Sequence, residues 1–430
     1  MPDERQTPLI AVAASGGCDS TALVFLMQKW VEKRNGKLIV LTVDHGLRAC
    51  AKQEAENFSK MLAHHGIECD ILTWQHDAFP QSAIQEQARL ARYQLLEKQC
   101  RKRGVKTLAI AHQQQDQVET FLYRLTCGSG LDGLSCMDKT SEKNQIQIIR
   151  PLLNVPRECL KKTCQNFAVP WIDDPSNEKD QFTRVRFRKA LDFLADEGLT
   201  AQRLCQTVEK LQQANTCLNR MTAESLSKQA VFYGAGFVAL DYVAWQQNDA
   251  EIQQRSLIAI LKWVSGQIYP PRMERLKKLL EALKEGKTFS RRTLSGCEVY
   301  LQKKNQKIWI YRELAAVEGA KKAVNFEQEF IWDHRFKVTL KDESMRVKIL
   351  GAEGFQQIKQ RYDECAKKNE HLQNIPACVK YTFVAITRDE NILYIPYLRL
   401  PIDDVCKAES WGELRYLPSL FGKDHAIEIV

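Results

Sequence analysis

The sequence lacks any apolar run that approaches the roughly twenty residues needed for a membrane-spanning helix. Its first residues contain neither a basic segment leading into an apolar core nor a cleavage signal. Fourteen cysteines are scattered along it, but none forms a Cys-x-x-Cys pair or a Cys/His cluster with zinc-ligand spacing. We therefore expect a protein of the cytoplasm with buried, reduced thiols, no membrane association and no zinc site.

What is present is sufficient for several hydrophobic cores. The 430 residues exceed one ordinary domain, and 44% of them are hydrophobic and 27% charged. This globular composition indicates two or three domains. Lysine and arginine outnumber aspartate and glutamate by nine (62 against 53). That balance permits a polyanionic partner such as nucleic acid without requiring one.

A glycine-rich loop organises the chain. It reads Ser15-Gly16-Gly17-Cys18-Asp19-Ser20 and stands between an apolar run at residues 9–14 and a segment of helical period. Two adjacent glycines let backbone N–H groups face an anion, and the serine hydroxyls and the positive end of the helix dipole meet there. No Gly-Lys-Ser/Thr sequence follows, so the loop is not a Walker A motif. We predict a phosphate cradle, with an ordinary turn closed by a helix cap as the alternative.

Strands and helices alternate through the first part of the chain. Strand patterns at residues 37–43, 67–74 and 107–111 are separated by helical patterns at 51–64 and 82–103. This alternation predicts an α/β fold with a parallel sheet and helices on both faces. Ligands lie over the carboxyl ends of the strands in such sheets. We therefore expect the glycine loop to meet the polar residues after the second and fourth strands in one cleft.

Polar residues follow the fourth predicted strand. His112, Asp116 and Glu119 are spaced four and three residues apart, which places them on one face if the segment is a helix. An acidic first turn also favours any helix, so a purely structural role is the alternative. On the preceding predicted helix, Arg89 and Arg92 are either site residues or solvated charges.

Beyond residue 200 the alternation stops. Helical patterns at 202–231, 251–261 and 272–283 and a short strand at 307–312 predict a mainly helical domain over residues 201–318, after a first domain over 1–200. Residues 319–430 are strand-rich with short helices, which predicts a small mixed α+β domain. The later part of the middle domain is basic, and its charges either contact nucleic-acid phosphates or form a solvated face. These charges are Arg272, Arg275, Lys277, Lys278, Lys284, Lys287, Arg291 and Arg292.

The glycine loop resembles the Ser-Gly-Gly-x-Asp-Ser loop of the N-type ATP pyrophosphatases, the PP-loop superfamily, which split ATP between its α- and β-phosphates. Further signatures follow in order, and together they make slightly less than half of the chain resemble the bacterial tRNA(Ile)-lysidine synthetases. These signatures are Asp44-His45-Gly46-Leu47-Arg48, Ala88-Arg89, Arg92-Tyr93, Asp116-Gln117-x-Glu119-Thr120, Gly128-Ser129-Gly130-Leu131-x-Gly133-Leu134, Arg150-Pro151-Leu152-Leu153, Asp174-Pro175-Ser176-Asn177 and Arg184-x-Arg186-x-Arg188.

This resemblance implies a carbon–nitrogen ligase that joins free L-lysine to the first anticodon cytidine of an isoleucine tRNA with a CAU anticodon. The cytosine oxygen attacks the α-phosphorus of ATP, pyrophosphate leaves, and the lysine ε-amine then displaces AMP. The product, lysidine, changes codon recognition from AUG to AUA. The resemblance also implies ATP and Mg²⁺ as cofactors, a homodimer, and a carboxyl-terminal tRNA-binding domain, although the usual basic helix of that domain carries Asp363 and Glu364 here.

The charges of this reaction assign roles to the candidate residues. The departing pyrophosphate needs donors and Mg²⁺, so Ser15, Gly16, Gly17, Cys18, Asp19 and Ser20 are expected to bind ATP, with Asp19 as metal ligand or metal orienter. The substrate ammonium needs carboxylates and a base, for which Asp116 and Glu119 are the natural pair, in either order. By resemblance, His112 and Arg92 belong to the reaction centre and Arg184 holds the carboxylate of the lysine.

Two other kinds of function are considered. One is another PP-loop enzyme, such as a tRNA thiolase, a GMP synthetase or an NAD synthetase. The unpaired cysteines disfavour sulfur transfer, and the length and lack of a nucleophile motif disfavour a glutaminase domain. The other is a nucleotide-sensing RNA-binding module without turnover. Such a module has no need of Asp116 and Glu119, whose charge would weaken ATP binding, so these carboxylates favour a cationic second substrate.

Overall fold

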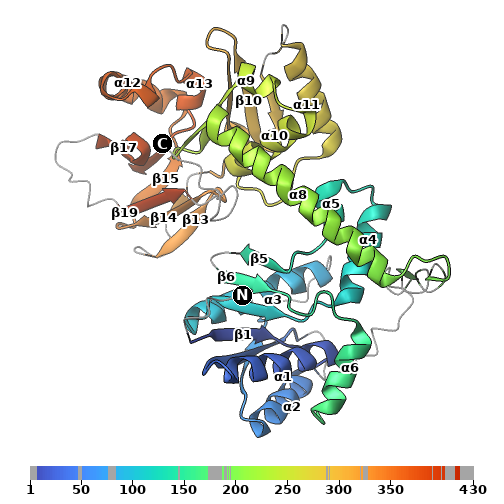
Figure 1. Cartoon of the computed structure of the whole chain (residues 1–430). Helices are drawn as coiled ribbons and strands as arrows, with labels where there is room; N and C mark the ends of the chain where they lie inside the picture. Colours follow the sequence, from blue (N-terminus) through green and yellow to red (C-terminus); the bar gives the residue numbers. More distant parts are fainter. Residues whose placement is uncertain are drawn as a thin grey trace. The chain divides into compact units, whose positions relative to one another are not determined.

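The computed structural model describes most of the chain as two compact units, residues 1–216 and 217–430, each of which is treated by itself (Figure 1). The described residues are 7–46, 51–75, 84–143, 146–172, 186–187, 191, 193, 195–286, 289, 291–319, 321–322, 328–389, 391–398, 400–401 and 412–416. Among them, no helix has the length and apolar character required to span a membrane.

The first unit is built on a six-stranded sheet. Its order is β3-β2-β1-β4-β6-β5, and every neighbouring pair is parallel except β5 with β6. The strands are β1 (Leu9–Ala13), β2 (Lys37–Asp44), β3 (Glu68–Thr73), β4 (Thr107–Ile110), β5 (Thr140–Lys143) and β6 (Ile146–Ile149). The parallel sheet predicted from the alternating pattern is therefore confirmed.

Helices cover both faces of this sheet. α1 (Cys18–Glu32), α2 (Ala51–His64) and α6 (Arg157–Asn166) pack on one face, and α3 (Ile84–Lys102) packs on the other (Figure 1). Successive side chains of a strand point to opposite faces, so Ile10 and Val12 join the core beneath α1, whereas Ala11 joins the core beneath α3. This two-sided burial explains why β1 is apolar throughout.

A smaller core supports the segment that follows β4. There α4 (Gln114–Thr126) packs through Val118 and Phe121 against Leu204 and Val208 of α8 (Ala201–Gln229), within the first unit. The short helix α5 (Leu131–Leu134) lies between α4 and β5 in the chain. The boundary between the two units falls inside α8.

The first half of the second unit contains more strand than the sequence predicts. Helices α8, α10 (Ala250–Ser265) and α11 (Met273–Glu285) lie close to the predicted ranges, and α9 (Tyr242–Gln246) is additional. They accompany an antiparallel sheet of order β7-β8-β11-β10-β9, of which only β11 was expected. The strands are β7 (Ala230–Tyr233), β8 (Phe237–Asp241), β9 (Arg292–Leu294), β10 (Cys297–Gln302) and β11 (Lys307–Arg312).

Burial on both faces explains why β8 escaped detection. Val238 and Leu240 of β8 join a core with α10 and α11, whereas Phe237 and Ala239 join a second core on the opposite face. A short strand that is apolar on both sides shows no alternation and cannot be distinguished from a buried helical segment by period alone.

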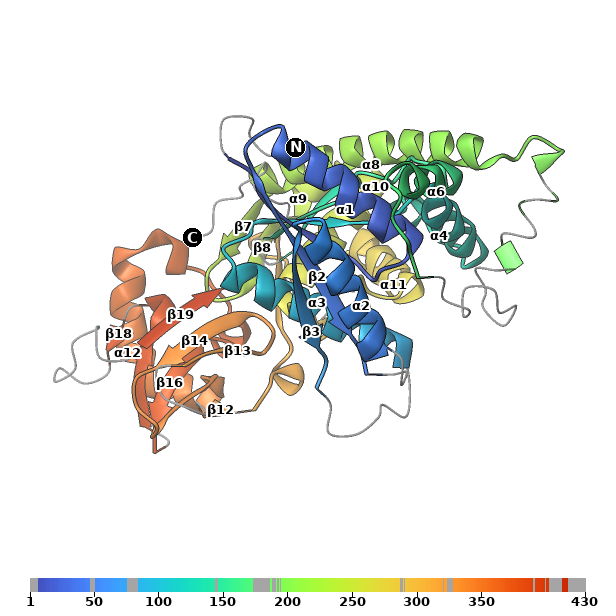
Figure 2. The same cartoon turned by 90° about the horizontal axis from the view of Figure 1, so that it is seen from below.

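The rest of the second unit is a mixture of strands and short helices, as predicted. One sheet has the order β12-β15-β16-β17-β18 and a second has the order β13-β14-β19, and the two share a core (Figure 2). The elements are β12 (Lys321–Lys322), β13 (Glu329–Trp332), β14 (Phe336–Leu340), β15 (Met345–Ile349), α12 (Gly351–Lys368), α13 (Ala377–Lys380), β16 (Val384–Arg388), β17 (Asn391–Ile395), β18 (Leu400–Pro401) and β19 (Gly412–Tyr416), with 3-10 turns at Leu314–Ala316, Glu370–Leu372 and Pro396–Leu398.

A buried ionic cluster lies within this unit. Asp333, in the turn between β13 and β14, is fully buried and accepts hydrogen bonds from Arg312 at 2.9 and 3.1 Å and from Arg335 at 2.7 Å. Burial alone would raise the pKa of Asp333, but the hydrogen bonds from Arg312 and the charges of Arg335 and Arg312 outweigh it and hold this pKa below its ordinary value.

Candidate active site

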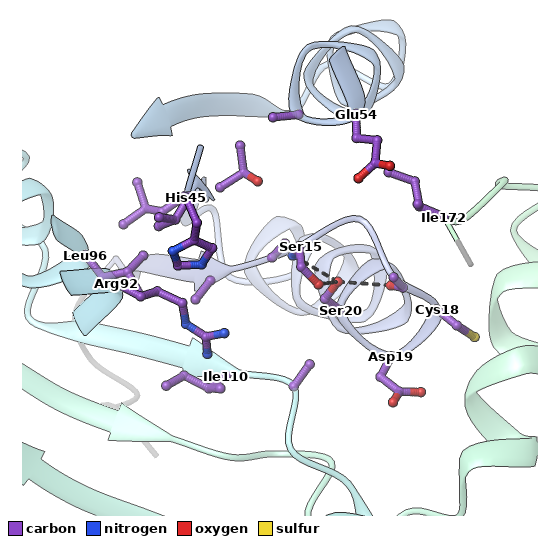
Figure 3. A pocket seen from close by; sticks show the side chains of 18 of the residues that line it. Ser15, Cys18, Asp19, Ser20, His45, Glu54, Arg92, Leu96, Ile110 and Ile172 are labelled. Atoms are coloured by element: carbon purple, nitrogen blue, oxygen red, sulfur yellow. Dashed lines mark hydrogen bonds between the residues drawn. The ribbon is translucent and has the colours of Figure 1, made fainter. Parts of the chain in front are cut away.

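The glycine loop connects the carboxyl end of β1 to the first turn of α1 and is shaped by its own side chains. The Ser15 amide donates to Ser20 Oγ at 3.2 Å, and Ser20 Oγ donates to the carbonyl of Gly17 at 2.9 Å (Figure 3). Gly16 has a φ of +79°, and a Cβ there would lie 2.8 Å from Cδ1 of Ile172. The loop therefore depends on a glycine at residue 16, as expected for a phosphate cradle.

The loop opens onto a cavity of about 410 Å³ at the carboxyl edge of the sheet. This volume suits a small-molecule ligand such as a nucleotide. One group of lining residues is apolar and comes from β1, β2, β4, α2 and α3, namely Ala13, Leu41, Val43, Ala55, Leu96 and Ile110. The polar residues of the lining come from the glycine loop, from β2, from the segments that follow β2 and β4, and from helices α2, α3 and α6. The sequence prediction of one cleft over the strand ends is consistent with this arrangement.

Arg92 and His45 project into this cavity from neighbouring elements (Figure 3). His45 follows β2, and its pKa is lowered by burial and then by the positive charge of Arg92 on α3. Burial also lowers the pKa of Arg92. Arg92 Nε and His45 Nδ1 are buried and have no hydrogen-bond partner among the described residues. These polar atoms fit a cavity that receives a polar, negatively charged ligand.

His112 lines the same cavity, but it does not lie on a helix. The prediction that it shares a helical face with Asp116 and Glu119 is therefore wrong, because α4 begins only at Gln114 and Gln113 is its N-cap. His112 instead occupies the segment between β4 and α4, where Arg150 Nε donates a hydrogen bond to its Nδ1 at 3.3 Å. Its place at the carboxyl end of β4 brings it to the cavity.

Asp116 and Glu119 lie on the first turns of α4 and do not line this cavity. An Asp116 carboxylate oxygen accepts a hydrogen bond from the Gln113 amide at 3.0 Å, while the Gln113 side chain accepts one from the Gln115 amide at 2.6 Å. This reciprocal arrangement is a capping box, so Asp116 stabilises the start of α4. Glu119 is only 3% exposed. Arg184 lies outside the described residues.

Two charged cavity residues were missed by the sequence reasoning. Glu54 reaches the cavity from α2, and Arg157 reaches it from the first position of α6. Arg157 Nε lies 3.9 Å from Asp19 Oδ1 and, like Arg92 Nε, is buried without a hydrogen-bond partner among the described residues. A usable signal existed for Arg157, because Pro156 marks a helix start shortly after β6 and therefore near the carboxyl edge of the sheet.

The cysteine of the loop has the character of a core residue. Cys18 is buried, and burial, followed by the charges of Cys164 and Asp19, raises the pKa of its thiol to about 12. A thiol with so high a pKa is a poor nucleophile at neutral pH. The cysteines in the described part of the chain are free thiols, but Cys127, Cys159 and Cys217 are exposed, so the expectation of buried thiols is met only in part.

The residues present fit the phosphates of ATP together with a divalent cation. The N-terminus of the 15-residue helix α1 faces the loop and adds positive potential to the loop amides. Mg²⁺ commonly takes one or two carboxylates and completes its shell with phosphate oxygens and water. Asp19 can serve as such a carboxylate. No group of three metal-binding side chains occurs in the part of the chain that the structure describes, so a site held by protein ligands alone is not indicated there.

Comparisons with known proteins show which family the chain resembles. A profile of the PP-loop domain family matches residues 2–193. The tRNA(Ile)-lysidine synthase of Wolbachia pipientis wMel is 32% identical over 393 residues, which cover 90% of this chain and 88% of the relative. The tRNA(Ile)-lysidine synthase of Orientia tsutsugamushi (strain Boryong) is 31% identical, and the match covers 92% of this chain and 90% of the relative. That from Ruegeria pomeroyi (strain ATCC 700808 / DSM 15171 / DSS-3) is 33% identical, covering 80% of each chain.

A solved structure is also similar to part of the chain. It is the U34-tRNA thiolase NcsA from Methanococcus maripaludis with its [4Fe-4S] cluster, with 17% identity and a TM-score of 0.43 over 49% of this chain and 74% of that one. A similarity of this size supports no inference about activity. The curated relatives, in contrast, match along both units of the chain. The chain belongs to the tRNA(Ile)-lysidine synthase family.

Proposed function

We propose that this protein is the ATP-dependent ligase that joins free L-lysine to the first anticodon cytidine of tRNA(Ile) with a CAU anticodon, forming lysidine, AMP and pyrophosphate. The observation that carries the proposal is the phosphate loop of β1 and α1, which opens onto a cavity of about 410 Å³ together with Arg92 and His112. Among the reactions that a nucleotide site can support, the extensive match to curated lysidine synthases favours the formation of lysidine.

The loop and its neighbours supply the chemistry that pyrophosphate release requires. The loop amides and the α1 dipole would bind the phosphates, and Arg92 and Arg157 would supply positive charge beside them. Bound at Asp19, Mg²⁺ would neutralise charge on the leaving pyrophosphate. The Asp19–Arg157 pair is loose at 3.9 Å, so Asp19 can exchange this partner for a cation.

The lysine half of the reaction is assigned to α4. Only the neutral amine attacks, so the substrate ammonium needs an anchoring carboxylate and a proton acceptor. We assign these tasks to Asp116 and Glu119, and leave open which of the two is the base. Both lie on the helix that follows β4, directly after the segment that carries His112. Arg184 is proposed to hold the carboxylate of the substrate.

The chain after residue 200 is proposed to bind the tRNA, through a middle domain over residues 201–318 and a carboxyl-terminal domain over residues 319–430. Exposed charges on and before α11 support this, since Arg272, Arg275 and Lys278 lie on its solvent face while Leu276 and Leu279 are buried. Exposed cations of this kind can neutralise backbone phosphates. We also propose a homodimer, and the cytoplasm as the place where tRNA, lysine and ATP meet.

The proposal is tested by incorporation of labelled lysine into tRNA(Ile) with ATP, comparing the wild type with Asp116→Asn. Asparagine keeps an oxygen that can accept the Gln113 amide but removes the charge that holds an ammonium, so we expect α4 to stay capped and incorporation to fall by at least about a hundredfold. Gln113→Ala is the matched control, since it weakens the same cap without removing the carboxylate. Release of pyrophosphate with tRNA but without lysine uptake by the wild type would overturn the lysidine assignment.

A further inference from the structure

Arg150 is held rigidly beside the cavity. It follows β6 directly, its Nη1 donates to the carbonyl of Asp138 at 2.9 Å and to Ser141 Oγ at 3.1 Å, and its Nε donates to His112 Nδ1 at 3.3 Å. Partial burial lowers the pKa of the guanidinium, yet an arginine stays protonated at any physiological pH. The two contacts of Nη1 therefore fix the direction in which Nε donates.

The pairing of two strands brings this arginine to the histidine. β4 and β6 are parallel neighbours, with Ala109 opposite Ile149. His112 and Arg150 leave the sheet at the same carboxyl edge, immediately beyond that pair. On the other side of His112, the backbone is held by Gln113, a buried N-cap residue of α4. The imidazole is thus positioned from the sheet and from the helix.

The hydrogen bond determines which nitrogen of His112 carries the proton. A guanidinium N–H can only donate, so Nδ1 must accept and can have no hydrogen of its own. The ring proton is then on Nε2, and the imidazole is neutral. A protonated imidazole would place an N–H donor and a second positive charge against Arg150 Nε at 3.3 Å. Such a contact opposes protonation.

We infer that Arg150 is a positioning residue that keeps His112 neutral with its proton on Nε2, so that His112 serves the cavity as a hydrogen-bond donor and not as a proton acceptor. The acceptor is an anionic oxygen of the bound nucleotide, whose identity as ATP rests on the proposed function. A fixed donor gains strength as negative charge develops on its acceptor, which favours the transition state over the ground state. The proton of the substrate amine then passes to a carboxylate, and His112 retains its own.

Other charges also act on the ring. The charged and titratable side chains that line the same cavity are Asp19, His45, Glu54, Arg92 and Arg157. Asp116 lies on the adjacent helix α4, and Arg150 itself interacts electrostatically with Tyr93, Asp138 and Arg89. The cations oppose protonation of His112 and the carboxylates favour it, and among the cations Arg150 donates a hydrogen bond directly to the ring.

Nitrogen-15 NMR of the full chain, labelled at histidine and assigned with His112→Gln, tests the tautomer without using the reaction. We expect a neutral Nε2–H ring that stays neutral to well below pH 6.5, the ordinary region for histidine. In Arg150→Met, which removes the donor but keeps an unbranched chain, we expect mixed tautomers and a titration near pH 6.5. A wild-type ring that is protonated on Nδ1, or cationic at pH 7, would overturn the inference even if the variant failed to fold.

Turnover tests the role of the donor. In His112→Gln the side-chain amide N–H lies near the position of the histidine Nε2–H and can replace it as a donor, but it cannot act as a base. In His112→Asn the shorter side chain places its amide near the position of the histidine Nδ1 instead. We expect pyrophosphate release by His112→Gln to exceed that of His112→Asn and His112→Ala by about tenfold in kcat, with similar KM values for ATP. Equal loss in all three variants contradicts a donor role. A wild type with the expected tautomer that forms no lysidine would overturn the proposed function and support the tautomer assignment.

Discussion

Arg157 and Asp19 show how two opposite charges can share one phosphate site. In the structure Arg157 Nε lies 3.9 Å from the carboxylate, and both residues line the cavity beside the loop. Binding of a nucleotide with Mg²⁺ would give each a new partner, the phosphates for the arginine and the metal for the aspartate. We therefore propose for Arg157 a role in phosphate binding that sequence reasoning did not assign.

Replacing Arg157 by alanine removes this charge from the phosphate site. We expect the KM for ATP to rise by about tenfold, equivalent to about 1.4 kcal/mol, with a smaller change in kcat. Initial rates of pyrophosphate release over a range of ATP concentrations measure both constants. Lys161→Ala is the matched control, because Lys161 also lies on α6 but pairs with Glu158. Equal effects of the two substitutions would contradict a contact between Arg157 and the phosphates.

Individual residues also show what sequence can and cannot predict about the site. The loop residues, Arg92 and His112 were predicted as site residues, and the structure places all of them except Gly16 in the lining of one cavity. Asp116 completes a capping box, as the alternative of a helix-stabilising acid expects, and its catalytic role stays a prediction. Spacing could not separate these roles, since an acidic first turn serves the helix dipole and a catalytic carboxylate equally well.

At the scale of single elements, the turn from β1 to α1 decides whether phosphates can bind. Its geometry requires a positive φ at Gly16 and close approach to Ile172. Gly66, between α2 and β3, has a similar φ of +70°, but no atom lies within 4 Å of the position that an added Cβ would take. A side chain would therefore strain the backbone at either glycine, but only at Gly16 would it also clash with a neighbouring side chain.

Substituting each glycine by alanine tests the loop. Both variants place an alanine in the left-handed region, which costs about 1–2 kcal/mol of unfolding free energy. Only Gly16→Ala also meets Cδ1 of Ile172, which must move or push the loop out of shape. We expect Gly16→Ala to lose ATP binding, measured by calorimetric titration, while Gly66→Ala binds as the wild type does. Unimpaired binding by Gly16→Ala would show that the loop tolerates a side chain there.

The start of α4 was misplaced by the sequence prediction for an identifiable reason. Regular spacing from residue 112 onward fits a helix, but Gln113 takes an extended backbone conformation and caps the helix with its side chain. Glutamine is an unusual residue for this position, which Ser, Thr, Asp or Asn normally occupies. His112 therefore lies outside the helix, after the end of β4, where Arg150 donates a hydrogen bond to it.

At the scale of the whole molecule, the second unit depends on a buried charge cluster. Asp333 is fully buried between Arg312 of β11 and Arg335 beside β14, so it connects two different sheets. Removing one member of a buried ion pair leaves its partners without compensation. The stability of this unit should therefore respond to Asp333 far more than to exposed ion pairs.

Asp333→Asn tests this connection and its dependence on pH. We expect a loss of about 3–5 kcal/mol in unfolding free energy at pH 7, read from denaturant unfolding of the full chain. The pKa of Asp333 in the folded protein lies below its ordinary value of 3.8. The carboxylate therefore contributes fully to the unfolding free energy above pH 3.8, and this contribution is lost as the pH falls through the pKa of the folded state. The difference between variant and wild type should shrink over that acidic range.

The exposed pair of Asp342 and Arg388 provides the control for this experiment. Its atoms are 2.6 Å apart, but both side chains are 41% exposed, so water screens the interaction. Asp342→Asn should change the unfolding midpoint little. If Asp333→Asn were as mild as Asp342→Asn, the buried cluster would not be the connection that stabilises the two sheets.

The charge of the second unit leads to a prediction about tRNA. If Arg275 on α11 contacts a phosphate, Arg275→Glu should weaken binding and reduce the slope of log K against log salt by about one unit. Filter binding over a range of salt concentrations measures this slope. Lys33→Glu makes the same change of net charge at the end of α1 remote from the phosphate loop. Equal slopes for the two variants would indicate that α11 does not touch the tRNA.

The sequence by itself determined the local features of this protein. A glycine loop between a strand and a helix, the alternation of strands with helices, and the ordered family signatures all depend on residues close together in the chain. Their conformations follow from local sterics and hydrophobic period. The sequence therefore sufficed for the parallel sheet, the phosphate loop and the family.

Only the tertiary structure decided which side chains share the cavity. Arg157 reaches Asp19, and Arg150 reaches His112, because parallel pairing places the ends of β1, β4 and β6 at one edge of the sheet. Strand β8 of the second unit likewise became evident only in the structure, because burial on both of its faces removes the alternation that marks a strand in sequence. Such contacts join residues far apart in sequence, and hydrophobic period carries no information about them. The glycine loop can thus be recognised from local sequence, whereas the contacts and the protonation of the residues around it depend on the tertiary structure.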